Sequence, residues 1–194
     1  GARFNYSASG FCKNVANPSP TFSSSPYPGN KVGVFSASSA GLVINSTTGQ
    51  IDLTASTAGT YTVTNTIAAA GSCPAITHTQ NVTVTAVPIT TFSYSTPICQ
   101  NSSNPTPTLG VGASNGVYSS TSGLNFVSTA TGQIDLVAST AGTYTVTNTI
   151  VASGGCPTTT STSSIVIVAP TQGVFSYAGS PYCQGGLNPN PTVA

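Results

Sequence analysis

Two stretches of the chain alternate strictly between two kinds of side chain. In residues 60–67, Tyr61 and Val63 are separated by threonines, and residues 143–150 repeat the same pattern. This period of two indicates a half-buried antiparallel strand, with Tyr, Val, Asn and Ile on the inner face and Thr on the outer face. Gly, Pro, Asn and Ser interrupt the chain at short intervals, and no stretch shows a period of 3.6 residues. Several short strands in about 85 residues predict an all-β fold, an antiparallel sandwich of about seven strands.

The chain repeats itself with an offset of about 83 residues. Residues 55–67 recur without change as residues 138–150, and Cys73 with its following Pro recurs as Cys156 with its following Pro. A period of this length suits a whole small domain.

A second motif divides the chain into domains. The order Phe-x-Tyr, then Cys, then Asn-Pro-x-Pro-Thr begins at Phe4, at Phe92 and again at Phe175. The chain therefore contains two full repeats and the first part of a third. We predict a first repeat over residues 1–88, a second over residues 89–170, and the N-terminal strands of a partial third over residues 171–194.

The last strand of each full repeat differs on its outer face. Val82 and Val84 are expected to face the core, and two isoleucines hold the same places in the second repeat. The opposite face carries threonines in the first repeat but Val166 and Val168 in the second. An apolar outer face suggests contact with a neighbouring domain or subunit. Two scattered surface valines would give the same sequence.

Charged side chains are almost absent. They make up 3% of the chain, against about 25% of an average soluble domain. Without basic residues there is no electrostatic footprint for nucleic acid or anionic lipid, and the longest apolar runs are too short to span a membrane. We therefore expect neither nucleic-acid binding nor membrane insertion. The chain begins at Gly1 and contains no Met, which suggests a processed product or a segment of something longer.

Few residues could support catalysis or a metal site. His78 is the single imidazole, and the second repeat has Ser in its place, so we expect a structural or exposed histidine. Asp52 and Asp135 follow equivalent Thr-Gly turns, where a carboxylate is expected to accept backbone N–H bonds. One carboxylate per repeat is too few for a calcium site or for a glycosidase pair, and no cysteines have the spacing of a zinc site. We expect no enzymatic activity and no cofactor, although covalent glycans are possible.

The repeated motifs resemble a known family of domains. The segment Gly-Thr-Tyr-Thr-Val-Thr at residues 59–64, together with its copy, looks like the Gly-x-Tyr-x-Val-Thr segment of bacterial immunoglobulin-like and PKD-like domains. The order of all the motifs resembles the tandem repeats of very large secreted surface proteins of Bacteroidota, which serve as adhesins, gliding surfaces or extracellular fibres. The resemblance implies tandem immunoglobulin-like β-sandwiches, in which Tyr61 makes a tyrosine-corner hydrogen bond. Unlike antibody domains, the chain has no Trp to pack on a disulfide.

Five cysteines follow the repeats. The simplest pairing is within each repeat, Cys12 with Cys73 and Cys99 with Cys156, with free buried thiols as the alternative. A disulfide that closes a loop of about 60 residues would remove roughly 4 kcal/mol of unfolded-state entropy, which would staple a small domain. Cys183 is left over, and its partner would lie in the rest of the third repeat or in another subunit. Disulfides imply an oxidising compartment, and therefore a secreted protein, extracellular or on the cell surface.

Hydroxyl side chains take the place of charges on the expected outer faces. Ser and Thr account for 60 of the 194 residues. One interpretation is a surface that carries O-linked sugars, and the other is that Thr is simply favoured on exposed strands. Four asparagines also stand in Asn-x-Ser/Thr sequences. The candidate glycosylation sites are Thr60, Thr62, Thr64, Thr66, Thr143, Thr145, Thr147, Thr149, Thr158, Thr159, Thr160, Asn5, Asn45, Asn81 and Asn101.

A structural function is the leading hypothesis. It is a fibre or stalk segment of a secreted bacterial surface protein, which either continues into further repeats or associates with itself. The partial third repeat could complete a sheet in the next subunit, as donor strands do. The alternative is an adhesin module that binds carbohydrate or protein, for which the loop at residues 25–31 is the candidate. The candidate residues for an assembly interface are Val166, Val168, Phe175 and Tyr177.

Overall fold

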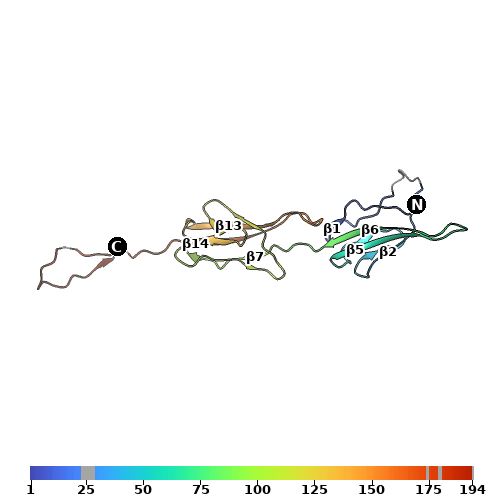
Figure 1. Ribbon diagram of the computed structural model, residues 1–194. Helices are drawn as coiled ribbons and strands as arrows, with labels where there is room; N and C mark the ends of the chain where they lie inside the picture. The colour runs from blue at the N-terminus through green and yellow to red at the C-terminus, as the bar shows by residue number, and fades with distance from the viewer. Residues whose placement is uncertain (23–28, 174, 179–180, 194) are drawn as a thin grey trace.

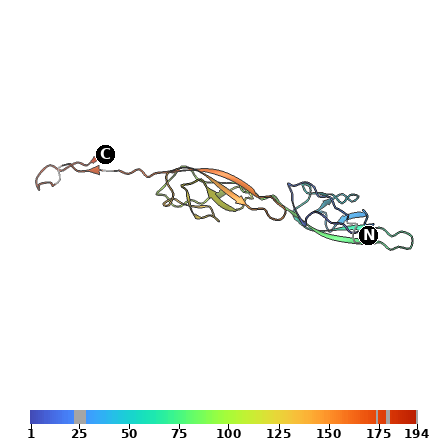
Figure 2. The same cartoon turned by 90° about the horizontal axis from the view of Figure 1, so that it is seen from above.

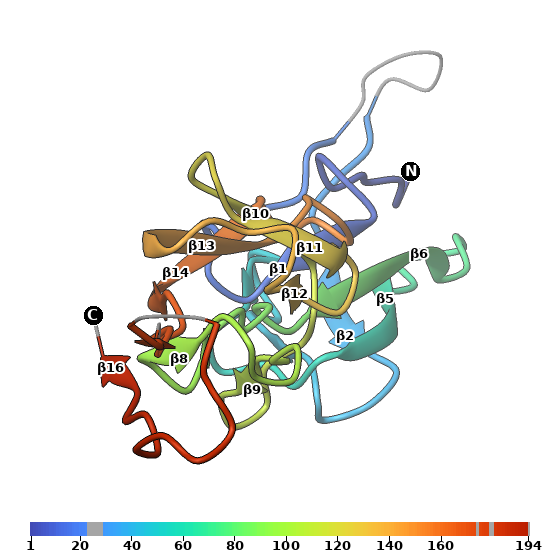
Figure 3. The same ribbon diagram turned by 90° about the vertical axis from the view of Figure 1, so that its left-hand side faces the viewer.

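The computed structural model describes residues 1–22, 29–173, 175–178 and 181–193. Within these ranges the regular secondary structure consists of β-strands, without helix. The two full repeats and the C-terminal segment follow one another in a line (Figures 1 and 2), and Figure 3 looks along that line with the C-terminal segment in front. Of the candidate adhesin loop, residues 25–28 lie outside the described residues.

The first repeat contains a main sheet of four strands in the order β1-β6-β5-β2. A separate two-stranded sheet, β3-β4, completes it. β5 and β6 form a long antiparallel hairpin, whereas β1 runs parallel to the end of β6, with Cys12 opposite Thr85. The strands are β1 (Gly10–Cys12), β2 (Val34–Ala37), β3 (Val43–Ile44), β4 (Ile51–Asp52), β5 (Gly59–Ile67) and β6 (Ile76–Thr85).

The second repeat has an equivalent main sheet in the order β8-β14-β13-β10. Two-stranded sheets β11-β12 and β7-β9 accompany it, and the C-terminal strands β15 and β16 pair with each other. The strands are β7 (Phe92–Ser93), β8 (Ile98–Cys99), β9 (Thr108–Leu109), β10 (Val117–Ser120), β11 (Asn125–Ser128), β12 (Gln133–Asp135), β13 (Gly142–Ile150), β14 (Thr159–Val168), β15 (Phe175–Ser176) and β16 (Thr192–Val193).

The structure differs from the predicted fold in two details. The main sheets are mixed and not wholly antiparallel, because the short edge strands β1 and β8 enter in the same direction as β6 and β14. In the described ranges the first repeat has six strands and the second has eight, where about seven were expected in each. The difference arises because the β7-β9 pair is represented in the first repeat by a single bridge between Asn5 and Thr21.

Each repeat has its own hydrophobic core. The cluster of the first repeat includes Phe4 and Val63, that of the second includes Val146 and Ile165, and the two clusters share no residue. The inner-face positions predicted from the alternation are buried, including Val82, except that Ile67 and Ile150 at the strand ends are half-buried, and none of the outer-face threonines of β5 and β13 is buried. The predicted inner and outer faces are therefore confirmed.

The repeated tyrosine makes the expected local hydrogen bond. Tyr61 Oη donates to the backbone oxygen of Thr57 at 2.9 Å, and Tyr144 Oη donates to that of Thr140 at 2.8 Å. The tyrosine-corner contact that the resemblance implies is thus present in both repeats, where it fixes the start of β5 and of β13.

A fully buried asparagine ties three segments of each repeat together. Asn65, on the inner face of β5, is 0% exposed. Its Oδ1 accepts the Gly33 N–H at 2.8 Å, and its Nδ2 donates to the Ala2 and Lys31 oxygens at 2.8 and 3.0 Å. Asn148 makes the three equivalent bonds in the second repeat, at 2.8 to 3.0 Å. The amide thereby holds the N-terminal segment and the loop before β2 against the sheet.

Asn65→Ala is predicted to destabilise the first repeat by about 3 kcal/mol, because it leaves one buried N–H and two carbonyl groups without partners. Hydrogen exchange measured by mass spectrometry should show faster exchange in peptides from residues 1–88 and unchanged exchange in residues 92–168. Thr64→Ala, on the outer face of the same strand, is the control and should stay within about 0.5 kcal/mol of the wild type. Equal protection in the two variants would contradict the proposed role of Asn65.

Candidate functional site

The hairpin between β13 and β14 reaches back to the end of the first repeat (Figure 1). Cys156, at its tip, forms a disulfide with Cys12 in β1, with 4.5 Å between their Cα atoms. Both cysteines are buried, at 0% and 3% exposed. The disulfide therefore crosses from one repeat to the next, and we call the region around it the joint.

The predicted pairing within each repeat, Cys12 with Cys73 and Cys99 with Cys156, is wrong. Cys12 lies opposite Thr85 at the end of β6, whereas Cys73 lies just before the start of β6. An extended strand of this length separates the two cysteines by about 40 Å, and a disulfide requires Cα atoms within about 7 Å. The same separation along β14 keeps Cys99 from Cys156.

Glycine allows the hairpin to approach β1 closely. The turn is closed by two hydrogen bonds between the backbones of Ser153 and Cys156, at 3.1 and 2.9 Å. Gly155 has φ of +83°, and a Cβ there would lie 2.4 Å from the Gly10 backbone oxygen. No other residue could adopt this backbone conformation so close to β1 without strain. Thr85 Oγ1 also donates to the Gly154 oxygen at 2.6 Å.

The joint connects the repeats a second time. The chain itself passes from β6 to β7 through residues 86–91, and the disulfide forms a separate bridge beside it. A single short connection allows two domains to bend and rotate, whereas two connections oppose both motions. The bridged cysteines are 144 residues apart, and closing a loop of this size constrains the unfolded chain by about 5 kcal/mol in the chain-entropy model.

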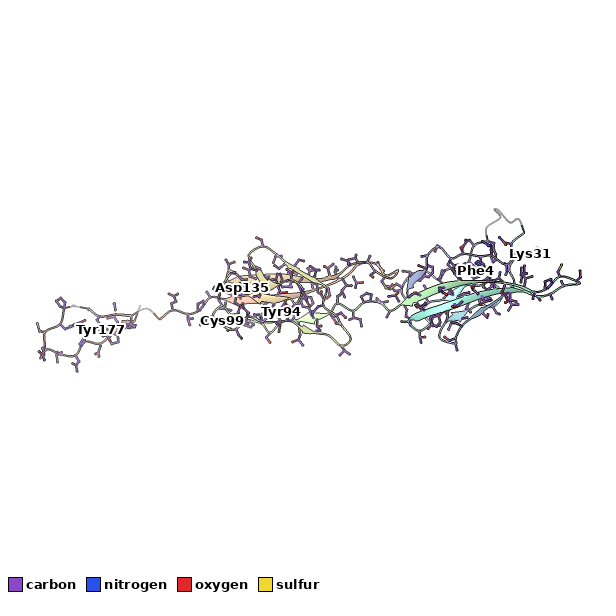
Figure 4. The ribbon with its side chains drawn as sticks, in the orientation of Figure 1. Phe4, Lys31, Tyr94, Cys99, Asp135 and Tyr177 are labelled. Atoms are coloured by element: carbon purple, nitrogen blue, oxygen red, sulfur yellow. A yellow bond between two sulfur atoms is a disulfide. The ribbon has the colours of Figure 1, made fainter. Side chains whose placement is uncertain are left out.

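Three cysteines are free thiols in the structure. Cys73 and Cys183 are exposed, and Cys99 is half-buried. Cys73 occupies the hairpin position that Cys156 holds in the second repeat, and Cys99 occupies the edge-strand position of Cys12. Figure 4 shows Cys99 at the end of the second repeat that faces the C-terminal segment.

The groups singled out as possible catalytic residues have structural contacts. His78 packs edge-on against Phe4, with 5.4 Å between the ring centroids. Asp52 Oδ1 accepts bonds from the Thr54 hydroxyl and from the Ala55 N–H, and these contacts hold the pKa of Asp52 below its usual range. Asp135 Oδ1 accepts the N–H of residue 138. Both carboxylates therefore accept backbone N–H bonds, as predicted.

The described residues contain no cluster of three His, Cys, Asp or Glu side chains that could hold a metal ion. Over the same ranges, no helix has the length and the apolar character needed to cross a membrane.

The remaining candidates lie on the surface. Val168 is 45% exposed, Phe175 62% and Tyr177 47%, while Val166 is half-buried. The four asparagines proposed for N-glycosylation are exposed. The threonine candidates are exposed or half-buried, and Thr60 and Thr62 form cross-strand hydrogen bonds at 3.0 Å.

A hollow of about 340 Å³ lies beside β3 and β4 and offers a possible place for a small ligand. Asn17 and Asp52 contribute polar groups to it. Both already accept backbone N–H bonds, Asn17 Oδ1 from Leu53 at 2.9 Å and Asp52 Oδ1 from Ala55 at 3.1 Å. The hollow therefore offers few uncommitted groups to a ligand.

Comparisons with known proteins find structurally similar proteins but no related sequence. No family model and no curated protein matches the chain. The structure is similar to Drosophila N-cadherin EC1-4, at 9% identity and a TM-score of 0.34, over 85% of this chain and 49% of that one. It is also similar to a SusE-like surface-located polysaccharide-binding protein of Bacteroides thetaiotaomicron, at 17% identity and a TM-score of 0.31, over 92% of this chain and 36% of that one. This chain thus spans half or less of the length of each.

Gly155→Ala is predicted to loosen the joint. The added Cβ would meet the Gly10 oxygen and would have to adopt a left-handed backbone, at a combined cost of about 1–2 kcal/mol. In a glutathione redox buffer, the equilibrium between the reduced and oxidised Cys12–Cys156 pair should shift about tenfold towards the thiols. Gly71→Ala is the control, because Gly71 is also a left-handed turn glycine, two residues before the cysteine of the free hairpin, and a Cβ there meets nothing within 4 Å. Identical equilibria in Gly155→Ala and the wild type would show that the close approach is unimportant.

Proposed function

We propose that this chain is a structural segment of an extracellular fibre or stalk, built from tandem immunoglobulin-like β-sandwiches. The observation that carries the proposal is the Cys12–Cys156 disulfide, because it couples two separate hydrophobic cores end to end. The repeats set the length of such a rod, and the disulfides between them set its stiffness.

The disulfide and the repeated motifs also support a location outside the cell. A disulfide of this kind persists in oxidising surroundings, so we place the protein outside the cell, secreted or at the cell surface. The likeness of its motif order to tandem surface repeats of Bacteroidota agrees with this location. With one imidazole and two carboxylates in the chain, we propose a role without enzymatic activity.

An adhesin module remains the second candidate function. The hollow beside β3 and β4 supports it, since Asn45 and Gln50 also line that hollow and both are exposed. The bonds that already occupy Asn17 and Asp52 make a binding role the weaker of the two. A carbohydrate or a surface protein would be the ligand class.

Replacing both Cys12 and Cys156 by Ser is predicted to turn a rigid rod into a hinged one. The connection at residues 86–91 would then be the single link between the repeats. Small-angle X-ray scattering of the monomeric fraction should show a narrow distribution of maximum dimensions for the oxidised wild type and a broad one for the double variant. Cys183→Ser is the control and should match the wild type. A wild type as flexible as the double variant would overturn the proposed role of the disulfide as a stiffener.

We further propose that the hydroxyl-rich faces carry O-linked glycans, whose hydration replaces that of charges. Peptides of the natural material that span these faces should then exceed the masses of their unmodified sequences by a series of sugar masses, which chemical deglycosylation removes. Peptide mapping should locate the sugars on the outer-face threonines, such as Thr143 and Thr145. Unmodified masses for all of these peptides would refute glycosylation and leave the fibre proposal intact.

A further inference from the structure

The joint pairs two kinds of cysteine, and the two full repeats contain one unpaired cysteine of each kind. We call Cys12 and Cys99 the edge-strand cysteines and Cys73 and Cys156 the hairpin cysteines. The observed disulfide joins an edge-strand cysteine to the hairpin cysteine of the following repeat. Cys99 and Cys73 are the remaining members of the two classes, and both are free.

The backbone around Cys99 has the same form as the backbone around Cys12. Both cysteines end a short strand that runs parallel to the last residues of the long hairpin, Cys12 opposite Thr85 and Cys99 opposite Val168. The next N–H donates to that opposite carbonyl in both cases, at 3.0 and 2.9 Å. A turn bond to the carbonyl of the cysteine itself follows in both cases, at 3.2 and 3.0 Å. Cys99 is therefore held in the orientation that allows Cys12 to form its disulfide.

The hairpin around Cys73 is likewise preformed. The backbones of Ala70 and Cys73 exchange two hydrogen bonds of 3.1 Å, as those of Ser153 and Cys156 do. Gly71 and Gly154, at the same position of the turn, both have φ of +58°. The free hairpin thus shares the closing hydrogen bonds and the first left-handed glycine of the bonded one.

Burial distinguishes the bonded cysteines from the free ones. Cys12 and Cys156 are covered by each other's repeats, whereas Cys73 is exposed and Cys99 is half-buried. Beside Cys99, Val168 leaves 45% of its surface in water. An apolar side chain there, next to an uncovered thiol, is what a missing hairpin would cover.

The two free positions lie at opposite ends of the rod. The β5-β6 hairpin projects beyond the first repeat, away from the second (Figure 1), and Cys99 lies at the far end of the second repeat (Figure 4). A contact between two different surfaces at opposite ends, repeated with a translation, generates an open filament and not a closed ring.

We propose that Cys73 of one copy forms a disulfide with Cys99 of a second copy, so that the chain assembles head to tail through joints of the Cys12–Cys156 kind. The inference rests on the proposed fibre function and names the residues that would extend the fibre. Cys183 is the equivalent of Cys12 and Cys99 in the repeated sequence motif, but it lies in an irregular stretch outside the main sheets, so its backbone is not held beside a long hairpin as theirs is.

The second joint would differ from the first in its closest contacts. Ser72 stands where Gly155 lies, and it has a negative φ, as have all described residues other than glycines. Pro97 stands where Gly10 lies, and a Cβ on Gly10 would be 3.3 Å from the Gly154 oxygen, which a small shift of the hairpin would relieve. In the observed joint the chain leaves β6 at the end where the disulfide lies, and it likewise leaves β14 at the end where Cys99 lies.

The bond forms by thiol–disulfide exchange with a small-molecule disulfide such as oxidised glutathione. The thiolate of Cys73, having lost its proton to solvent, attacks oxidised glutathione, forms a mixed disulfide and releases one glutathione thiolate. The thiolate of Cys99 from the second copy attacks the protein sulfur of that mixed disulfide and releases the second glutathione. Two protein thiols are oxidised and one glutathione disulfide is reduced to two thiols.

Two complementary variants test the proposal in the full chain, each in a Cys183→Ser background. Cys73→Ser retains Cys99, and Cys99→Ser retains Cys73, so each variant lacks one half of the joint. Each is incubated with oxidised glutathione, alone and as an equimolar mixture. Non-reducing electrophoresis then measures linked dimer, and chymotryptic mapping identifies the linked cysteines.

The expected result is a Cys73–Cys99 dimer that forms about tenfold faster in the mixture than in either variant alone, because docking brings the thiols together before exchange. The Cys183→Ser chain with both free cysteines should form a ladder of longer species. Equal rates of dimer formation, or a dimer linked through two copies of Cys99 or of Cys73, would overturn the inference.

Electron microscopy of the same samples separates this inference from the proposed function. Fibres that form equally in the Cys73→Ser variant would overturn the covalent joint while supporting the fibre. Linked dimers that remain flexible and never lengthen in the two-cysteine chain would support the joint chemistry but count against the fibre function.

Discussion

The form of this protein depends on a hairpin that extends beyond its own domain. β13 and β14 are longer than the core beneath them requires, and their outer part carries Cys156 to the edge of the preceding repeat. Because that contact is covalent and lies beside the connecting chain, the relative placement of the two repeats is held at two points. The two repeats are thus held end to end although their hydrophobic cores share no residue.

Within each repeat, a buried side-chain amide forms hydrogen bonds to backbone groups that an additional strand would bind in a larger sheet. Asn65 reaches three backbone groups that belong to no strand, and Asn148 repeats the arrangement. Tyr6 and Tyr94 act similarly, since each donates to the oxygen of a turn glycine at 2.5 Å. Their burial raises the pKa of both phenols above its usual value, so both remain hydrogen-bond donors even in mildly alkaline solution. Short strands are thus sufficient to form each repeat, because neutral side chains supply hydrogen-bond partners for the backbone groups of the loops.

Much of this architecture is local and could be predicted from the sequence. The alternation along residues 60–67 fixes which side chains are buried, and it places Asn65 on the inner face without indicating its distant partners. The cysteine pairing could not be predicted, because it depends on which end of the domain each cysteine reaches. That depends on the parallel entry of β1 beside β6, and Gly10–Cys12 is too short to reveal a direction. The repeated sequence also favoured the wrong pairing. Each full repeat contains two cysteines, so the simplest prediction joins the two within one repeat.

The same disulfide has a mechanical consequence. A pull on the two ends of the chain passes from β1 directly through the sulfur–sulfur bond into β14 and bypasses residues 13–155, which lie inside the covalent loop. Fully extended, that stretch would measure roughly 500 Å. While the bond is intact, the residues inside the loop cannot lengthen the molecule, and only the segments outside it, residues 1–11 and those after residue 156, can be pulled from the cores. Reduction would release the contour length of the loop, so redox chemistry sets how far most of the chain can stretch under load.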